Sequence, residues 1–216
     1  MDFIGAYSPD HLKFLLEGFY VTLKIAFFSI ILSFLIGGLI GTLRYAKIPV
    51  VSKLLAVIVE TIRNLPLLLI IFFTYFALQD IGIILSITVS AITALTIFEL
   101  AMLSEIIRSG LNSIDKGQIE AARSSGLTYF QTLMYIIMPQ ALRRMVPPIV
   151  SQFISLLKDT SLAVIIALPE LTHNAQIING QKTSYIIPIF LLVAFMYFLV
   201  NYTLSIIARR LEAKSI

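Results

Sequence analysis

Long apolar runs alternate with short polar segments along this chain. A helix needs about 20 predominantly apolar residues to cross the hydrocarbon core of a bilayer. Five runs meet this requirement, and they predict an all-α integral membrane protein with a single transmembrane domain over residues 1–216. The expected spans are about 18–43, 54–78, 81–106, 145–168 and 184–208.

The composition supports a membrane location. Hydrophobic residues make up 58% of the chain, charged residues 13%, and the mean hydropathy is +0.95. A core of 216 residues could not bury that much apolar surface in water, so lipid is the expected surrounding. The net charge of +4 is dispersed between the apolar runs and forms no one-sided basic stripe, which argues against a nucleic-acid partner. The chain contains no cysteine, so disulfide and thiolate chemistry are excluded.

The first apolar run is expected to remain as a membrane anchor, because Asp2, Asp10 and Glu17 precede it in place of a basic region. The distribution of Lys and Arg predicts that the N-terminus is outside and the C-terminus in the cytoplasm. With this orientation the outer segments hold only Lys13 and Lys182. The cytoplasmic segments hold eleven basic residues, namely Arg44, Lys47, Lys53, Arg108, Lys116, Arg123, Arg143, Arg144, Arg209, Arg210 and Lys214. The long polar segment at about 107–144 is then cytoplasmic.

Local signals in this polar segment predict two short helices joined by a corner. Asp115 can cap the first helix, and Gly126 suits a left-handed residue that ends it. Thr128 and Gln131 match a capping box that opens the second helix, which is expected to end before Pro139. On spacing alone, a hairpin packed on its own bundle and a docking element for a soluble partner are equally favoured.

Polar residues in the fourth span gather on one side of the expected helix. At 100° per residue, they fall within an arc of about 120°. An ionisable residue in the hydrocarbon core costs roughly 2.5 to 3.5 kcal/mol and normally faces the protein interior or a wet cavity. The arc is therefore expected to line a helix interface or a substrate path, or else to let Lys158 pair with a buried carboxylate. Its members are Ser151, Gln152, Ser155, Lys158 and Asp159.

Several motifs carry a resemblance to one transporter family. The run EAARSSGLTYFQTLMYIIMP, with Glu120-Ala-Ala, Gly126 and Pro139, resembles the EAA loop of the membrane subunits of ATP-binding-cassette importers. The stretches that begin at Arg63 (RNLPLL) and at Lys158 (KDTSL) resemble the polar amino acid subgroup of type I importers, which take histidine, glutamate, glutamine or arginine. The resemblance covers nearly the whole chain, and the motifs follow in the same order.

This resemblance implies a permease subunit in a prokaryotic plasma (inner) membrane. Such a subunit pairs with a second permease subunit, two cytoplasmic ATPases and an extracytoplasmic amino acid-binding protein or domain. The EAA helix of these importers sits in a cleft of the ATPase. The chain lacks a P-loop, so ATP and magnesium are expected on the ATPase, and no cofactor, metal or enzymatic activity is expected on this chain. The residues expected to couple to the ATPase are Glu120, Ala121, Ala122, Arg123 and Gly126.

The same resemblance implies a substrate pocket near the bilayer midplane. Lys158 would receive the substrate carboxylate, and Gln152 offers an amide where permeases for basic amino acids carry a glutamate. A neutral or acidic substrate is therefore expected, namely glutamine, asparagine, glutamate or aspartate. Ser155 lies on the same arc, and Arg63 and Asn64 are further candidates near the helix-breaking Pro66.

Glu99 departs from the subgroup, which often has small or amide residues at this depth. Because an unpaired buried carboxylate is costly, it is expected to form a structural ion pair with Lys158 or Lys24, although it could instead receive the substrate ammonium group. The alternative function is an ion channel or ion-coupled secondary transporter that uses Glu99, Lys158 and Asp159 as a relay. A third reading is a membrane anchor for an assembly.

Overall fold

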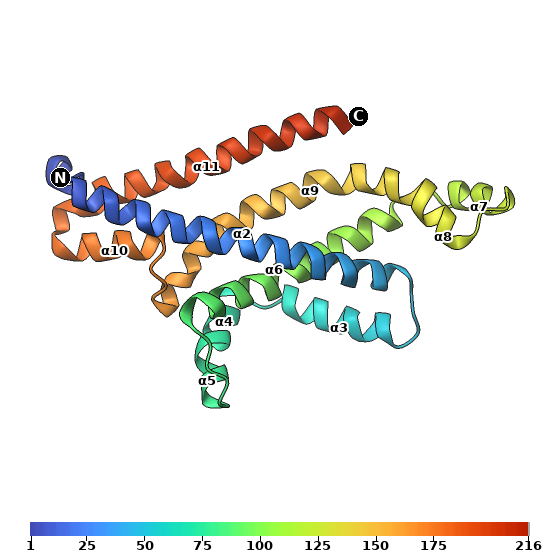
Figure 1. The fold of residues 1–216 in the computed structure, drawn as a ribbon, viewed down its shortest axis with the longest axis horizontal. Helices are drawn as coiled ribbons and strands as arrows, with labels where there is room; N and C mark the ends of the chain where they lie inside the picture. The colour runs from blue at the N-terminus through green and yellow to red at the C-terminus, as the bar shows by residue number, and fades with distance from the viewer. Residues whose placement is uncertain (216) are drawn as a thin grey trace.

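The computed structural model describes residues 1–215, with side chains described as far as Arg210, so the side chain of Lys214 lies outside it. The described chain is helical nearly throughout (Figure 1). Within residues 1–215, four helices are long and apolar enough to cross a membrane, and a bent helix pair is the fifth candidate. The expected all-α membrane fold is therefore confirmed.

The helices form an elongated bundle whose long axis follows α2, α6, α9 and α11 (Figure 1). The short helices α7 and α8 lie at one end of this axis, and α10 lies with the N-terminus at the other. In chain order the elements are α1 (Phe3–Ala6), α2 (Pro9–Tyr45), α3 (Val51–Arg63), α4 (Leu67–Phe72), the π-helix η1 (Phe73–Ala77), α5 (Leu78–Asp80), α6 (Ile87–Asn112), α7 (Lys116–Ser124), α8 (Tyr129–Thr132), the π-helix η2 (Leu133–Ile137), α9 (Met138–Asp159), the 3-10 helix η3 (Thr160–Ile166), α10 (Leu171–Gln181), the 3-10 helix η4 (Thr183–Tyr185) and α11 (Ile186–Ser215).

Small residues on α2 allow close packing against α6. A Cβ atom added at Gly37 would lie 2.8 Å from the carbonyl oxygen of Leu100, and one added at Gly41 would lie 2.7 Å from that of Ser104. Small side chains at helix interfaces are typical of membrane proteins, because close backbone contact replaces the hydrophobic driving force that lipid does not supply. The contact between α2 and α6 therefore depends on the absence of side chains at these positions.

A single methyl group at Gly37 should destabilise the protein measurably. We expect Gly37→Ala to cost about 1 to 3 kcal/mol through overpacking against Leu100. Gly38→Ala is the matched control, because its Cβ would have only the Cδ1 atom of Ile107 within 4 Å, at 3.8 Å. Thermal denaturation of the two purified variants in the same detergent tests this prediction. Both substitutions raise the helix propensity equally, so overpacking at Gly37 is what should separate the two midpoints. Equal midpoints would contradict the prediction.

The second expected span, 54–78, is not a single straight helix. α3 ends at Arg63, α4 begins at Leu67, and the two segments are bent by 101°. Pro66 lies between them in an extended conformation, with φ −61° and ψ 129°. A proline lacks the N–H group and disfavours helical geometry in the preceding residue, which explains the break. The segment α4–α5 consequently projects sideways from the bundle (Figure 1).

The sequence predicted that the second helix of the polar segment ends before Pro139, and this prediction is wrong. Helical backbone continues from Tyr129 through Asp159, so α8, η2 and α9 form one continuous rod. The turn before Pro139, Leu133–Ile137, is π-helical. This wider turn changes the hydrogen-bond pattern where the proline ring and its missing N–H would disrupt an α-helix. The polar segment is therefore joined directly to the fourth span.

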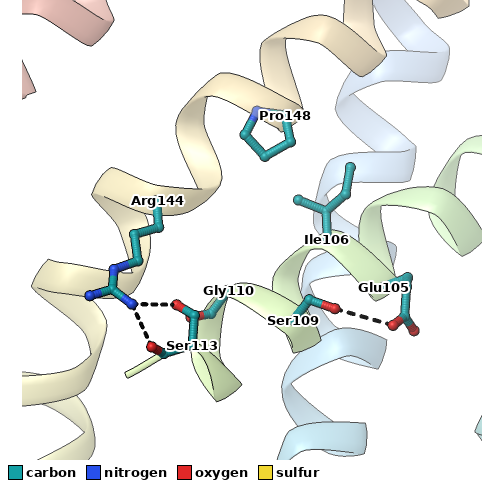
Figure 2. Close-up of a pocket in the computed structure, with 7 residues that line it drawn as sticks. All are labelled: Glu105, Ile106, Ser109, Gly110, Ser113, Arg144 and Pro148. Atoms are coloured by element: carbon teal, nitrogen blue, oxygen red, sulfur yellow. Dashed lines mark hydrogen bonds between the residues drawn. The ribbon is translucent and has the colours of Figure 1, made fainter. Parts of the chain in front are cut away.

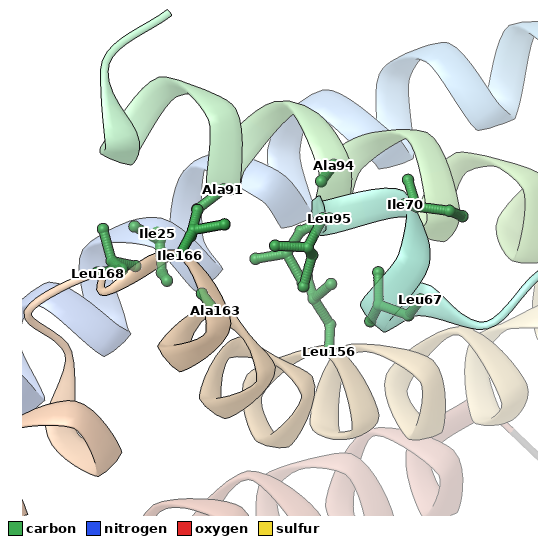
Figure 3. Close-up of a cluster of buried hydrophobic side chains, with 11 residues drawn as sticks. Ile25, Leu67, Ile70, Ala91, Ala94, Leu95, Leu156, Ala163, Ile166 and Leu168 are labelled. Atoms are coloured by element: carbon green, nitrogen blue, oxygen red, sulfur yellow. The ribbon is translucent and has the colours of Figure 1, made fainter. Parts of the chain in front are cut away.

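Of the three apolar clusters buried in the described chain, two lie at different levels along α6 and α9. The first cluster, with Leu95 of α6 and Leu156 of α9, also includes residues from α2, α4 and η3 (Figure 3). The second cluster includes Leu103 of α6 and Ile149 of α9. Between these two clusters lie nearly two helical turns of each helix, residues 96–102 of α6 and 150–155 of α9.

The end of the bundle near the N-terminus is tied together by a buried carboxylate. Glu170 caps α10 by accepting hydrogen bonds from the backbone N–H of Thr172 (2.9 Å) and of His173 (2.8 Å). It also accepts from the hydroxyls of Thr22 on α2 (3.4 Å) and Tyr197 on α11 (3.3 Å). Burial raises the pKa of Glu170, whereas the two backbone N–H groups lower it. These contacts join three helices at one level.

Candidate substrate site and coupling helix

The predicted corner of the polar segment is present. Asp115 accepts a hydrogen bond from the N–H of Gly117 (2.6 Å) and begins α7, and Gly126 is left-handed with φ +87°. The N–H of Leu127 bonds to the carbonyl of Ala122 and the N–H of Gly126 to that of Arg123, which is a Schellman motif. The predicted capping box then opens α8. The local signals therefore predict the starts of both helices and the corner between them correctly.

The two faces of α7 have different surroundings. Ala122 is only 7% exposed because it packs on the chain's own bundle, and Gln118 accepts a hydrogen bond from Gln140 of α9 at 2.6 Å. Arg123 donates to the carbonyl of Leu127 at 2.7 Å and so holds the corner. Ala122 thus allows close approach of the chain's own helices, while Glu120 and the neighbouring Ala121 are exposed. A soluble partner can reach the face that carries Glu120.

Glu99 and Gln152 meet at mid-depth in the bundle. Glu99 lies twelve residues from the start of α6 at Ile87 and thirteen from its end at Asn112. Its side chain is fully buried, and Nε2 of Gln152 donates to its Oε2 at 3.1 Å. The pair lies on the stretch of α6 and α9 between the two apolar clusters. The structure therefore places a hydrogen-bonded polar pair between two apolar layers.

The expected ion pair of Glu99 with Lys158 or Lys24 is wrong. Among the described residues, neither lysine forms a salt bridge with Glu99, and Gln152 is its hydrogen-bond partner. The buried Oε1 atom of Glu99 has no hydrogen-bond partner within the described part of the chain. The reason is the helical position of Lys158, which lies away from the α6 face of α9, whereas Gln152 is turned toward it.

The polar arc on α9 is only partly covered by the rest of the chain. Ser151 and Lys158 are exposed, and Ser155, Gln152 and Asp159 are half-buried. Within the described residues Lys158 forms no ion pair. Lys158 lies six residues beyond Gln152, which is roughly 9 Å of helix rise. The arc thus carries the free ammonium group of Lys158 and, more than one and a half helical turns away, the amide of Gln152.

Arg63 and Asn64 are not part of this arrangement. Asn64 donates to the carbonyl of Glu60 at 2.7 Å and so satisfies an acceptor at the end of α3. Arg63 pairs with Glu60 at 3.3 Å, as their spacing suggested, and also approaches Glu105 of α6 at 3.8 Å. Glu105 pairs further with Arg44 at 3.0 Å and with Arg108. An ion cluster therefore joins α2, α3 and α6. Its members are Arg44, Glu60, Arg63, Glu105 and Arg108.

A cavity of about 360 Å³ lies between α6 and α9, on the side of the ion cluster (Figure 2). Its charged groups already have partners. Arg144 donates to the backbone oxygen and the hydroxyl of Ser113, and Glu105 accepts from Ser109 at 3.2 Å as well as from the arginines. The cavity therefore offers a ligand little free polar chemistry, in contrast to the arc on α9.

Sequence reasoning missed the buried role of Arg44, which it counted only as a cytoplasmic positive charge. The side chain is 7% exposed, and its Nη1 atom also donates to Ser104 at 3.2 Å. The sequence carried one signal of a charged site on α6, because Glu105 and Arg108 are spaced to face the same side of that helix. The contact itself needs the close approach of α2 and α6, which only the folded chain provides.

Comparisons with known proteins agree on one family. Residues 33–216 match the family described as "Binding-protein-dependent transport system inner membrane component". The probable glutamine ABC transporter permease protein GlnP of Bacillus subtilis (strain 168) is 77% identical over 99% of both chains. The probable glutamine ABC transporter permease protein GlnM of the same strain is 36% identical over 95% of this chain and 94% of that one. The crystal structure of an amino acid ABC transporter with histidines has a chain that is 29% identical, with a TM-score of 0.92 over 99% of both chains.

Proposed function

Because this chain belongs to the family of binding-protein-dependent transport system inner membrane components, we propose that it forms the translocation path for a polar neutral or acidic amino acid. It is a multi-pass permease subunit of an ATP-binding-cassette amino acid importer and not an enzyme. The observation that carries the proposal is the free cation of Lys158 on the polar arc of α9, roughly 9 Å of helix rise from the Gln152–Glu99 pair. Transporters of this kind bind substrate near the midplane.

The chemistry of the arc suits one end of an amino acid. An ammonium group whose charge is not neutralised by its own chain is a good partner for a carboxylate, which every amino acid carries. Lys158 supplies that group, and the amide of Gln152 can hydrogen-bond an uncharged or acidic side chain without attracting a cationic one. Glutamine, asparagine, glutamate and aspartate are the substrates that fit. The name of the 77% identical relative, a probable glutamine permease, supports this class.

The energy is proposed to come from separate subunits. We assign Glu120 the contact with a cytoplasmic ATPase, because it is exposed on a helix that is fixed to the fourth span through Gln118 and Gln140. Two ATPases would carry the ATP and magnesium, and a second permease subunit and an extracytoplasmic binding protein or domain would complete the importer. The excess of basic residues on the α7 side supports a cytoplasmic position for α7 and an outer N-terminus.

The alternative, an ion-coupled carrier or channel, has less support. A proton or ion relay would need Glu99, Lys158 and Asp159 within reach of one another. Glu99 instead bonds to Gln152, and Lys158 forms no ion pair among the described residues. Such a carrier would also have no use for the exposed face of α7.

A screen of the twenty amino acids tests the proposed function. The chain would be reconstituted with its ATPase and binding protein, and ATP-dependent uptake of each labelled amino acid would be measured. We expect uptake of at least one of the four proposed substrates and none of arginine or lysine. Uptake of arginine in preference to the amide and acidic amino acids would contradict the assignment of Gln152 and Lys158.

A further inference from the structure

Another cavity, also of about 360 Å³, lies at the end of the bundle that carries α7 and α8 (Figure 1). The turn after α2, the end of α6, α7 and the start of α8 form its wall. Its lining includes Lys47 and Lys116, both exposed, together with Tyr45 and Tyr129. Among the described residues neither lysine forms an ion pair. Unlike the cavity between α6 and α9, this one therefore has free cations in its wall.

The helix ends at this cavity do not explain both lysines. Lys47 follows the C-terminus of α2, where the helix dipole favours a cation. Lys116 instead occupies the first position of α7, where the dipole disfavours a cation. The carboxylate of Asp115 caps that end of α7 and does not form an ion pair with Lys116. A ligand of negative charge would give Lys116 a favourable partner that its own helix does not provide.

The backbone at Lys47 is strained. Its φ is +53°, in the left-handed region that glycine or asparagine usually occupies after a helix. Backbone strain of this kind is concentrated at functional sites, where the side chain is needed at that point. Lys47 thus brings an ammonium group to the cavity at a position where its own backbone favours glycine.

Two tyrosines add hydrogen-bond donors to the same space. Tyr45 is half-buried, and Tyr129 is exposed. Burial, and to a lesser degree the neighbouring Tyr129, raise the pKa of Tyr45, so its hydroxyl keeps its proton at neutral pH and can donate to an anion. Tyrosine is also enriched at membrane–water interfaces, because its ring is apolar and its hydroxyl is polar.

The cavity lies at the expected edge of the membrane. The spans predicted for α2 and α6 end at about residues 43 and 106, and the first lining residue of the cavity is Tyr45. The turn that carries Lys47 also borders an apolar cavity of about 510 Å³, whose lining includes Val50, Leu54 and Val57. Positive and apolar surfaces therefore lie close together where lipid headgroups meet lipid chains.

From this arrangement we propose that the cavity binds the phosphate headgroup of an anionic phospholipid. Lys47 and Lys116 hold the phosphate, Tyr45 and Tyr129 donate to its oxygens, and an acyl chain lies on the apolar surface that begins at Val50. A free phosphate has the same charge chemistry but no apolar part. Anionic lipids give the cytoplasmic leaflet a negative surface potential that attracts lysine and arginine. The proposal rests on the proposed cytoplasmic position of α7 and on no property of the substrate.

Native mass spectrometry of the detergent-purified permease–ATPase complex tests the proposal without substrate. Phosphatidylglycerol and phosphatidylcholine with identical acyl chains would be added, and the ratio of their dissociation constants measured. We expect the wild type to bind phosphatidylglycerol about tenfold more tightly or better. The double variant Lys47→Gly/Lys116→Gln should lose most of this preference, because each lysine contributes roughly a factor of five. Glycine suits the left-handed backbone at position 47, so the variant is expected to fold.

Lys53→Gln/Arg143→Gln is the matched control, because it also removes two positive charges. Both residues are exposed, and neither lines the cavity. This variant should keep the preference for phosphatidylglycerol. An unaltered preference in Lys47→Gly/Lys116→Gln would overturn the proposal. Equal binding of the two lipids by the wild type would also overturn it, as expected if an acidic segment of the ATPase covered the lysines.

Inorganic phosphate provides the last arm of the test. It should not displace phosphatidylglycerol when added at the same concentration, because it lacks the acyl chains. Displacement would identify a site for free phosphate and would contradict a lipid site. The proposed function is decided separately by ATP-dependent uptake in the complete importer.

Discussion

Glu120→Arg should reduce ATP-driven uptake about 30-fold or more while leaving substrate binding unchanged. Glu120 is exposed on α7, on the face opposite the buried Ala122, so it is free to contact an ATPase. Truncating or reversing one partner of a buried charge pair at an interface costs about 2 to 5 kcal/mol, and each 1.4 kcal/mol is a factor of ten. Uptake in proteoliposomes and co-purification of the ATPase would be measured together.

Ser125→Arg is the control for Glu120→Arg, because Ser125 is exposed at the end of α7 and the substitution introduces the same side chain about 140° around the helix, off the face that carries Glu120. It should retain most of the uptake. Glu120→Gln removes only the charge and should give an intermediate loss. Full ATP-driven uptake in Glu120→Arg would mean that α7 does not transmit the energy of ATP hydrolysis.

Lys158→Met should weaken substrate binding about 10- to 100-fold. The variant keeps a side chain of similar length but removes the ammonium group proposed to hold the substrate carboxylate. A hydrogen bond to a charged group contributes about 1.5 to 3 kcal/mol, which corresponds to this range. Two quantities would be measured: the KM for glutamine in ATP-dependent uptake, and the dissociation constant of glutamine from the permease–ATPase complex in nanodiscs.

Lys24→Met provides the matched control for Lys158. Lys24 is an exposed lysine within another spanning helix, α2, and among the described residues it also forms no ion pair. The same substitution there should leave the KM unchanged. Equal values for Lys158→Met and the wild type would remove Lys158 from the substrate site, and equal increases for both lysine variants would point to a general effect of surface charge.

The features that sequence predicted correctly depend on residues close together in the chain. The apolar runs identify the spans because lipid requires a continuous apolar helix. Asp115, Gly126 and the capping box of Thr128 and Gln131 determine the corner through hydrogen bonds between residues at most five apart. Such signals act between residues that are close in sequence, so distant contacts in the folded protein do not change them.

The features that sequence missed depend on contacts between distant helices. Pro66 indicated a helix break, but not the bend of 101° nor the packing of α4 against η3 and α6 that follows it. The helix continues through Pro139 because a π-helical turn precedes it, and no local signal marked that turn. Glu99 was assigned a lysine partner by charge alone, whereas the helix orientation brings Gln152 to it. Charge identifies which partners are possible, and packing decides among them.

Glutamine uptake into proteoliposomes, measured with and without ATP inside, tests the central claim most directly. The vesicles would contain this chain, any second permease subunit and the ATPase, with binding protein outside and with ionophores that collapse proton and sodium gradients. The proposed mechanism predicts uptake that requires both ATP and the ATPase and that persists in the presence of ionophores. Uptake that follows an ion gradient when the ATPase is omitted would contradict it.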